Sequence, residues 1–203
     1  MAAAGKQSPY FMYFPDDYRW SAAVINMLGS ATFGSADVGE IHQIGRLVQD
    51  RIGDDAGWFD ACVKVGERVR SFAADREATG HPISAANAYR RACVIYQMGE
   101  RFRTPKDEPA PAAYRSGVDC FHRFIELTTD AKIEVVEVPY EGGSLPGYFV
   151  HAKNTQATRA PCVVFFDGLD VTKELQYGRG VEDLVKRGMS CLVMDGPGTG
   201  EAI

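Results

Sequence analysis

Between about residue 16 and residue 129, apolar side chains recur every three or four positions. This period places them along one edge of an α-helix, which other helices must then cover. The breaks agree, because Gly53-Asp54-Asp55 can end one helix and cap the next, and Thr79-Gly80-His81-Pro82 can join two antiparallel helices. The stripes comprise Ile41, Ile44, Val48 and Ile52; Phe59, Cys62, Val69 and Phe72; Tyr89, Cys93 and Tyr96; and Tyr114, Val118, Phe121 and Ile125.

From about residue 132 the pattern becomes that of strands. Residues 133–138 are rich in β-branched side chains, residues 139–143 have turn composition, and residues 145–151 can return as a second strand. The short apolar runs 162–166 and 191–194 are typical of strands buried on both faces of a parallel sheet.

A helical pattern over residues 173–187 separates the two apolar runs, so the sequence predicts a right-handed βαβ unit. We therefore expect an α/β protein with a helical, cap-like domain over residues 1–130 and the start of an open sheet over residues 131–203. Two parallel strands and one crossover helix cannot cover both faces of a sheet. The fold is expected to be incomplete, with its remainder in a C-terminal segment or a second polypeptide.

Composition narrows the classes of function. The chain of 203 residues carries a net charge of −5, which argues against a nucleic-acid partner. The basic pair Arg90 and Arg91 is interpreted as a solvated helix face. No apolar run approaches the roughly 20 residues that span a bilayer, and no secretory signal is visible, so we expect a cytoplasmic protein without a membrane partner. The five dispersed cysteines are expected to be buried, reduced thiols.

Two segments that follow the apolar runs carry the candidate chemistry. Residues 165–174 read Phe-Phe-Asp-Gly-Leu-Asp-Val-Thr-Lys-Glu, and residues 193–201 read Val-Met-Asp-Gly-Pro-Gly-Thr-Gly-Glu. In this order the segments resemble the α/β-hydrolases, in which a glycine loop after the third strand supplies one N–H of the oxyanion hole. The resemblance covers roughly residues 132–203. It implies that Gly168 lets the backbone turn, that Leu169 offers its N–H, and that the second segment shapes the mouth of the site.

A more particular resemblance joins the long helical segment with the Gly-Leu-acid-x-Thr-Lys-Glu pattern. Both features are similar to a group of carbon–carbon bond hydrolases that includes 2,6-dihydroxypseudooxynicotine hydrolase, fungal polyketide-shortening hydrolases and FrsA-like proteins. There a glutamate of this loop assists a Ser-His-Asp triad, and Asp170 holds the matching position with a side chain one methylene shorter. The aromatic stretch 10–15 would suit an aryl ketone or polyketide-like substrate if it faced the site, although such stretches more often pack in a core.

The nucleophile of such an enzyme is missing from these residues. No Gly-x-Ser-x-Gly occurs, and Ser144 stands in a predicted hairpin turn followed by Leu145-Pro146. All four histidines, His42, His81, His122 and His151, precede the predicted parallel strands. In α/β-hydrolases the triad runs serine, acid, histidine, so the whole triad is expected outside this chain.

Other classes fit the residues less well. The Gly196-x-Gly198-x-Gly200 pattern could open a dinucleotide site, but Pro197 suits a turn better. No phosphate-binding loop and no metal-ligand spacing is found in the sequence. Residues 55–103 could form one helical hairpin of an interaction module, although stable arrays of such units need about three repeats.

We therefore expect a serine-type hydrolase that cleaves a C–C bond next to a ketone, in an aromatic or polyketide-like substrate. Asp170 would polarise or protonate the ketone, and Leu169 would stabilise the oxyanion. The alternatives are a carboxylesterase or amidase of the same fold, and a non-catalytic helical binding protein. No metal or organic cofactor is required for this chemistry. The resemblance implies a homodimer; a second chain that carries the catalytic half is the other expected partner.

Overall fold

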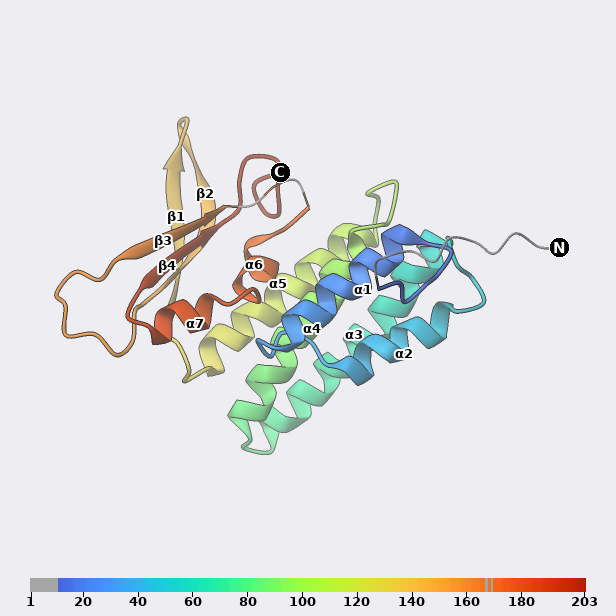
Figure 1. The fold of residues 1–203 in the computed structure, drawn as a ribbon, viewed down its shortest axis with the longest axis horizontal. Coiled ribbons are helices and arrows are strands. Elements are labelled where there is room, and N and C mark those ends of the chain that lie inside the picture. The colour runs from blue at the N-terminus through green and yellow to red at the C-terminus, as the bar shows by residue number, and fades with distance from the viewer. Residues whose placement is uncertain (1–10, 167, 169) are drawn as a thin grey trace.

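The N-terminal part of the chain is a bundle of helices. The structure is a computed structural model, which describes residues 11–166, 168 and 170–203. Within these residues the bundle consists of α1 (Tyr18–Ala31), α2 (Val38–Val48), α3 (Asp55–Ala78), α4 (Pro82–Glu100) and α5 (Ala110–Leu127) (Figure 1). The described helices include none with the length and apolarity that a bilayer crossing requires.

Aspartates cap the first three helices. Asp17, Asp37 and Asp54 stand just before α1, α2 and α3, and each side chain accepts hydrogen bonds from backbone N–H groups of the first turn. Such caps satisfy donors that have no partner inside the helix. The predicted break at Gly53-Asp54-Asp55 is therefore confirmed. The break at residues 79–82 is confirmed as well, because α4 begins at Pro82.

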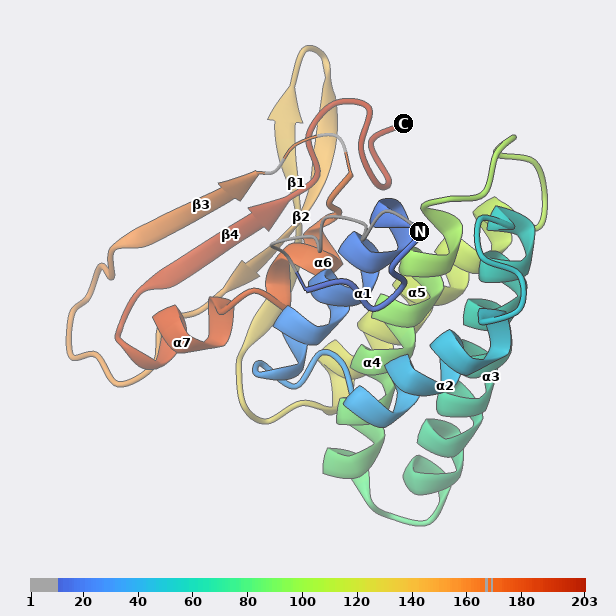
Figure 2. The same ribbon diagram turned by 45° about the vertical axis from the view of Figure 1, so that its right-hand side comes forward.

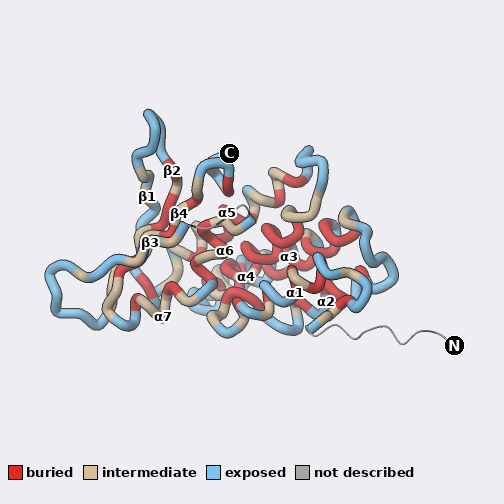
Figure 3. The backbone as a smooth tube through the Cα atoms, turned by 45° about the horizontal axis from the view of Figure 1, so that its top comes forward, coloured by how far each residue is buried: buried red, intermediate tan, exposed pale blue. Residues whose placement is uncertain are grey.

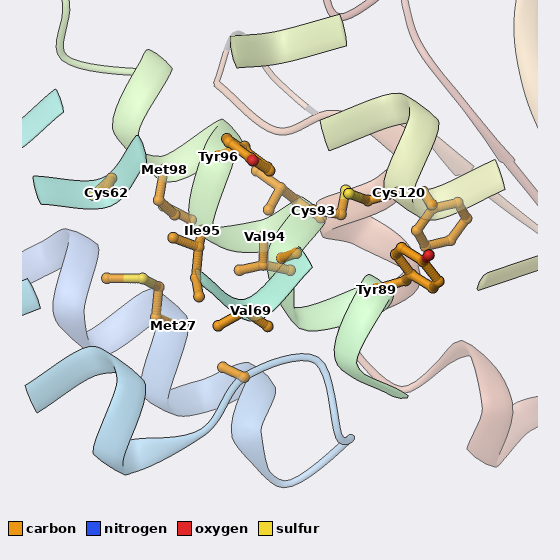
Figure 4. Close-up of a cluster of buried hydrophobic side chains, with 14 of the residues drawn as sticks. Met27, Cys62, Val69, Tyr89, Cys93, Val94, Ile95, Tyr96, Met98 and Cys120 are labelled. Atoms are coloured by element: carbon orange, nitrogen blue, oxygen red, sulfur yellow. The ribbon is translucent and has the colours of Figure 1, made fainter. Parts of the chain in front are cut away.

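Helix α4 is the centre of the helical part. It packs antiparallel to α3 on one side and contacts α5 on the other. Figure 4 shows its buried side chains between their neighbours, with Val94 and Ile95 toward Val69 of α3 and Met27 of α1, and Cys93 toward Cys120 of α5. The predicted helical stripes are largely buried. Ile52 and Phe72 are exceptions, because Ile52 lies beyond the end of α2 and Phe72 points to solvent from α3.

The C-terminal part forms a mixed sheet in the order β1-β2-β4-β3. Strands β1 (Ile133–Tyr140) and β2 (Gly143–Val150) pair as an antiparallel hairpin, as predicted. The turn consists of Glu141 and Gly142, which both have positive φ angles, the geometry of the tight hairpin turns. Strand β4 (Ser190–Met194) pairs antiparallel with β2 and parallel with β3 (Cys162–Phe166).

The connection between β3 and β4 differs from the prediction of one helix over residues 173–187. It contains two short helices, α6 (Lys173–Tyr177) and α7 (Val181–Lys186). Gly180 separates them with a φ of 98°, a left-handed conformation that cannot continue an α-helix. A side chain at Gly178 would collide with the Ser35 hydroxyl. The glycine therefore lets the connection pass close to the loop after α1.

Strand β3 is more exposed than its sequence predicts. The run Cys162–Phe166 was expected to be buried on both faces, yet Val164 is 50% and Phe166 is 73% exposed. Figure 3 shows the contrast between this strand and the buried β4. The physical reason is position, because β3 lies at the end of the described sheet and has β4 on one side alone. Cys162 is exposed for the same reason, which corrects the expectation that all cysteines are buried.

The basic pair of α4 is the clearest correction. Arg90 was expected on a solvated face, but it is 6% exposed and lies between the bundle and the α/β part. Its guanidinium pairs with Glu182 of α7 at 2.6 Å and donates to the carbonyls of Phe33 and Gly34. Arg91 is also paired, with Glu40 of α2. These partners are 51 to 92 residues away in sequence, so local patterning could not reveal them.

Aromatic rings complete the contact between the two parts. Phe121 and Phe124 of α5 pack against Tyr177 of α6, and Phe121 also packs on Tyr148 of β2. All four side chains are almost fully buried. The turned ribbon in Figure 2 shows α6 next to the bundle, at the junction with the sheet. The helices and the sheet therefore share one continuous hydrophobic core.

Candidate active site

A cavity of about 610 Å³ lies where the helical part meets the loops that follow β3 and β4. The two strands are parallel, so their carboxyl ends lie at the same edge of the sheet. We call residues 167–172 the β3 loop and residues 195–203 the β4 loop. Its walls come from both loops, from α4 and from α5. The polar residues that line it include Gln97, Arg101, Tyr114, Asp170, Thr172 and Glu201. Ligand sites of open α/β sheets lie at this edge.

The structure places one of the three predicted site residues in the wall of the cavity. Asp170 lines it, with its side chain 57% exposed. Gly168 is exposed in the β3 loop, and its carbonyl accepts a hydrogen bond from the Val171 N–H at 3.4 Å. Leu169, the predicted oxyanion donor, lies outside the described residues. Its role therefore stays a prediction.

Asp170 has a partner that the sequence did not indicate. The Arg101 Nη2 at the end of α4 donates to Asp170 Oδ2 at 2.9 Å, across 69 residues of sequence. This ion pair connects the helical part to the β3 loop at the cavity wall. The carboxylate of Asp170 accepts hydrogen bonds, and its exposed position in the wall leaves it within reach of a ligand.

One wall of the cavity is backed by a charge cluster, of which three members are buried and the fourth, Glu201, lines the cavity. We define it as Lys173 and the three carboxylates of Glu174, Asp195 and Glu201. The Lys173 ammonium lies 2.9 Å from Glu174, 2.8 Å from Asp195 and 2.6 Å from Glu201. Lys173, Glu174 and Asp195 are each about 1% exposed. Buried charges of this kind are tolerated only when paired and hydrogen-bonded.

The charge cluster joins α4 to the sheet through Glu174. One carboxylate oxygen accepts from the Gln97 amide at 3.0 Å, and the other accepts from the Tyr148 hydroxyl at 2.7 Å. Thr172 Oγ1 donates to the side-chain oxygen Oε1 of Gln97 at 2.7 Å, and it also caps α6. Gln97 therefore has both ends of its amide engaged, which determines the orientation of the amide.

The pKa directions follow from these contacts. Burial lowers the pKa of Lys173, but the surrounding carboxylates outweigh burial and raise it overall, so the ammonium stays charged. Burial would raise the pKa of Glu174, yet Lys173 and the hydrogen bonds from Tyr148 and Gln97 lower it overall. For Asp195, burial is the largest effect and the pKa is raised, despite Lys173.

Asp195 also holds the β4 loop in place. Its two oxygens accept the backbone N–H groups of Lys173 at 2.8 Å and Glu201 at 3.1 Å. Gly200 has a φ of 58°, and a Cβ there would lie 2.2 Å from the Asp195 carboxylate. The position of the Asp195 carboxylate therefore leaves room only for a glycine at residue 200. This supports the interpretation that the segment shapes the loop.

The sequence did not indicate the charge cluster. Its members all stand in the two motif segments: Lys173, Glu174, Asp195 and Glu201. The available signal was the position of Asp195, which directly follows the apolar strand β4. What the pattern cannot show is that β3 and β4 are neighbours with their ends aligned. That pairing brings residues 22 and 28 positions apart into contact.

Other candidates lie away from the cavity. Ser144 is in the β1–β2 hairpin, where its hydroxyl donates to Glu137 at 2.6 Å, so it is no nucleophile elbow. The cavity lining includes none of the four histidines. It also includes none of the aromatic stretch 11–15, in which Phe14 packs on Trp20 and Trp58. In the described part of the chain no cluster of three or more His, Cys, Asp or Glu side chains has metal-binding geometry.

Comparisons with known proteins agree with this geometry. No protein-family model matches the sequence. The hydrolase LUC6 of a Fusarium species is 30% identical over 92% of this chain and 45% of its own length. The 20-hydroxy-prefusarin hydrolase FUS2 of Gibberella moniliformis is 30% identical over 87% of this chain and 42% of its own length. The chain thus spans less than half of these curated relatives.

Solved structures support the fold. The 2,6-dihydroxy-pseudo-oxynicotine hydrolase superposes with a TM-score of 0.67 at 20% sequence identity, over 86% of this chain and 46% of that one. AbyA5 superposes with a TM-score of 0.52 at 24% identity, over 82% and 43%. In its sequence and in its fold, this chain matches the N-terminal portion of the α/β-hydrolases of this group.

Proposed function

We propose that this chain supplies the helical part and the opening strands of a serine-type hydrolase that cleaves a C–C bond next to a ketone. The observation that carries the proposal is the cavity at the carboxyl ends of β3 and β4, roofed by α4 and α5 and lined by Asp170. The similarity to named hydrolases supports hydrolysis as the reaction class. A polyketide-like substrate is suggested by the relative named for 20-hydroxy-prefusarin.

The proposed mechanism assigns a role to each side of the cavity. A serine outside these residues, activated by a histidine–acid pair, attacks the ketone carbon. The Leu169 N–H stabilises the negative charge that develops on the carbonyl oxygen. Asp170 acts on the substrate ketone, and its contact with Arg101 sets the position of the carboxylate before substrate binds. The helical part covers the substrate from the side opposite the sheet.

A substrate comparison tests the reaction. On the complete protein that carries the serine, 1-phenylbutane-1,3-dione should be hydrolysed to benzoate and acetone or to acetate and acetophenone. p-Nitrophenyl acetate reports the esterase alternative. Cleavage of the ester without any cleavage of the diketone would favour the carboxylesterase. Neither activity, together with no labelling by a fluorophosphonate probe, would favour a non-catalytic binding protein.

The role of Asp170 has its own test. Asp170→Asn in the complete protein keeps the shape of the side chain but removes its charge and its capacity to take up a proton. We expect kcat for the diketone to fall on the order of 100-fold with an unchanged melting temperature, as for other acid–base groups. Asp130→Asn is the matched control, since Asp130 is an exposed aspartate before β1. An unchanged kcat in Asp170→Asn would remove this residue from the mechanism.

A further inference from the structure

We propose that the Tyr114 hydroxyl is a catalytic donor that stabilises the enolate leaving group of the C–C cleavage. This inference rests on the proposed function and adds a residue that the predicted machinery does not contain. Tyr114 lies in α5 and lines the cavity together with Asp170 and Thr172. Its side chain begins one of the helical stripes that the sequence assigned to the core.

The hydroxyl of Tyr114 is placed without a protein partner. Its oxygen is buried, and no hydrogen-bond partner exists for it in the described part of the chain. An unsatisfied buried polar group is costly, so such a hydroxyl usually finds its partner in a water molecule or a ligand. The other polar groups behind the cavity are engaged with one another, since Gln97 and Tyr148 both donate to Glu174. We infer that an oxygen of a ligand bound in the cavity is the hydrogen-bond partner of the Tyr114 hydroxyl.

The electrostatics make this hydroxyl a donor. Burial raises the pKa of Tyr114, and the negative charges of Glu174, Asp195 and Glu201 raise it further. The phenol therefore keeps its proton at neutral pH and can act as a hydrogen-bond donor. The charge cluster contains three carboxylates and one ammonium, so it repels negative charge on a ligand, and such charge needs donors on this wall to stabilise it. The guanidinium of Arg101, on the same wall, partly offsets this repulsion.

These conditions suit a carbonyl that becomes negative during the reaction. In a 1,3-diketone, serine adds to the first carbonyl carbon, and the oxyanion forms there. When this adduct collapses, the bond between that carbon and the central carbon breaks. Its electron pair forms a C=C bond to the second carbonyl carbon, and the second carbonyl π pair moves onto oxygen. The Tyr114 O–H donates a hydrogen bond to that enolate oxygen.

The remaining steps balance without an added reagent. The enolate takes a proton at its central carbon from the protonated histidine of the triad, which gives the methyl or methylene ketone. Water then hydrolyses the acyl-enzyme to the carboxylic acid and restores the serine. An ester such as p-nitrophenyl acetate has no second carbonyl conjugated to the breaking bond. The Tyr114 donor should therefore matter for the diketone and have little effect on the ester.

The test compares Tyr114→Phe with wild type in the complete protein. Tyr114→Phe should lower kcat for 1-phenylbutane-1,3-dione on the order of 100-fold, as the loss of one transition-state donor does. The kcat for p-nitrophenyl acetate should change less than about threefold. Tyr89→Phe is the matched control, because Tyr89 of α4 donates to Glu77 and does not line the cavity. An unchanged diketone rate, or equal losses on both substrates, would overturn the proposal.

A binding measurement separates this inference from the proposed function. If wild type cleaves no diketone, the proposed C–C hydrolysis fails, and calorimetry with 1-phenylbutane-1,3-dione then decides the role of Tyr114. A carbonyl bound by the hydroxyl should bind about tenfold more weakly to Tyr114→Phe, the effect of one hydrogen bond of about 1.4 kcal/mol. Equal affinities of the two proteins would show that the hydroxyl does not touch the diketone.

Discussion

At the scale of the residue, Lys173 decides whether the site can form. Its ammonium contacts three carboxylates, of which Glu174 belongs to α6 while Asp195 and Glu201 belong to the β4 loop. The ammonium also lies over the ring of Tyr148, 5.3 Å from the ring centroid. Lys173 thereby attaches the start of α6, which directly follows the β3 loop, to the β4 loop, and the cavity wall depends on that attachment.

Replacement of Lys173 by methionine tests this dependence. Lys173→Met keeps the stem but leaves Glu174 and Asp195 buried without a counter-ion, which should lower the free energy of unfolding by about 3–5 kcal/mol. Urea denaturation followed by circular dichroism measures the change. Lys186→Met, at an exposed lysine at the end of α7, is the control and should stay within about 0.5 kcal/mol. Equal stabilities of the two variants would mean that the charge cluster is not stabilising.

At the scale of the element, the C-terminal half of α4 connects the bundle to the α/β part. In the middle of the helix Arg90 reaches Glu182 of α7; farther along, Gln97 reaches Glu174 of α6, and just past its end Arg101 reaches Asp170. One face of α4 therefore sets the positions of α6, α7 and the β3 loop. We expect these contacts to specify one arrangement of the neighbouring elements, as buried polar groups do in some proteins.

The Arg90 contact gives a prediction for the element. Arg90→Met should destabilise the protein on the order of 3 kcal/mol, because Glu182 and the carbonyls of Phe33 and Gly34 lose their donor. Differential scanning calorimetry of Arg90→Met and of Arg46→Met, at an exposed arginine of α2, measures the difference. A loss that is the same in both variants would show that the interface does not depend on Arg90.

The elements also show what a sequence can predict. The caps at Asp54 and Pro82 and the hairpin of β1 and β2 were predicted, because a few adjacent residues determine each of them. The burial of Arg90 and the Arg101–Asp170 pair were not, because their partners are 92 and 69 residues away. Asp170 was found through a motif, whereas Tyr114 looked like a core residue of its helix. Local signals thus located the β3 loop. The cavity beside this loop exists because the loop packs against α4 and α5, which local signals do not show.

At the scale of the whole molecule, the sheet ends in an open face. Strand β3 has β4 on one side, and the side chains of Val164 and Phe166 point into solvent. The curated relatives are more than twice as long as the matched region, which is enough to add further strands and helices. We expect the active protein to cover this face with a strand and a helix from the polypeptide that carries the serine, since exposed apolar strands otherwise associate.

The open face predicts opposite effects of one substitution in two proteins. In the 203-residue chain, Val164→Lys should reduce self-association, because a charge on an end strand opposes pairing with another copy. In the complete protein, the same lysine would be buried beneath the added elements and should lower the melting temperature by several degrees. Sedimentation velocity measures the first effect and differential scanning fluorimetry the second. Val38→Lys, at an exposed valine of α2, should change neither quantity. If Val164→Lys left the complete protein as stable as wild type, the face of β3 would be open there too, and the rest of the hydrolase would have to be attached elsewhere.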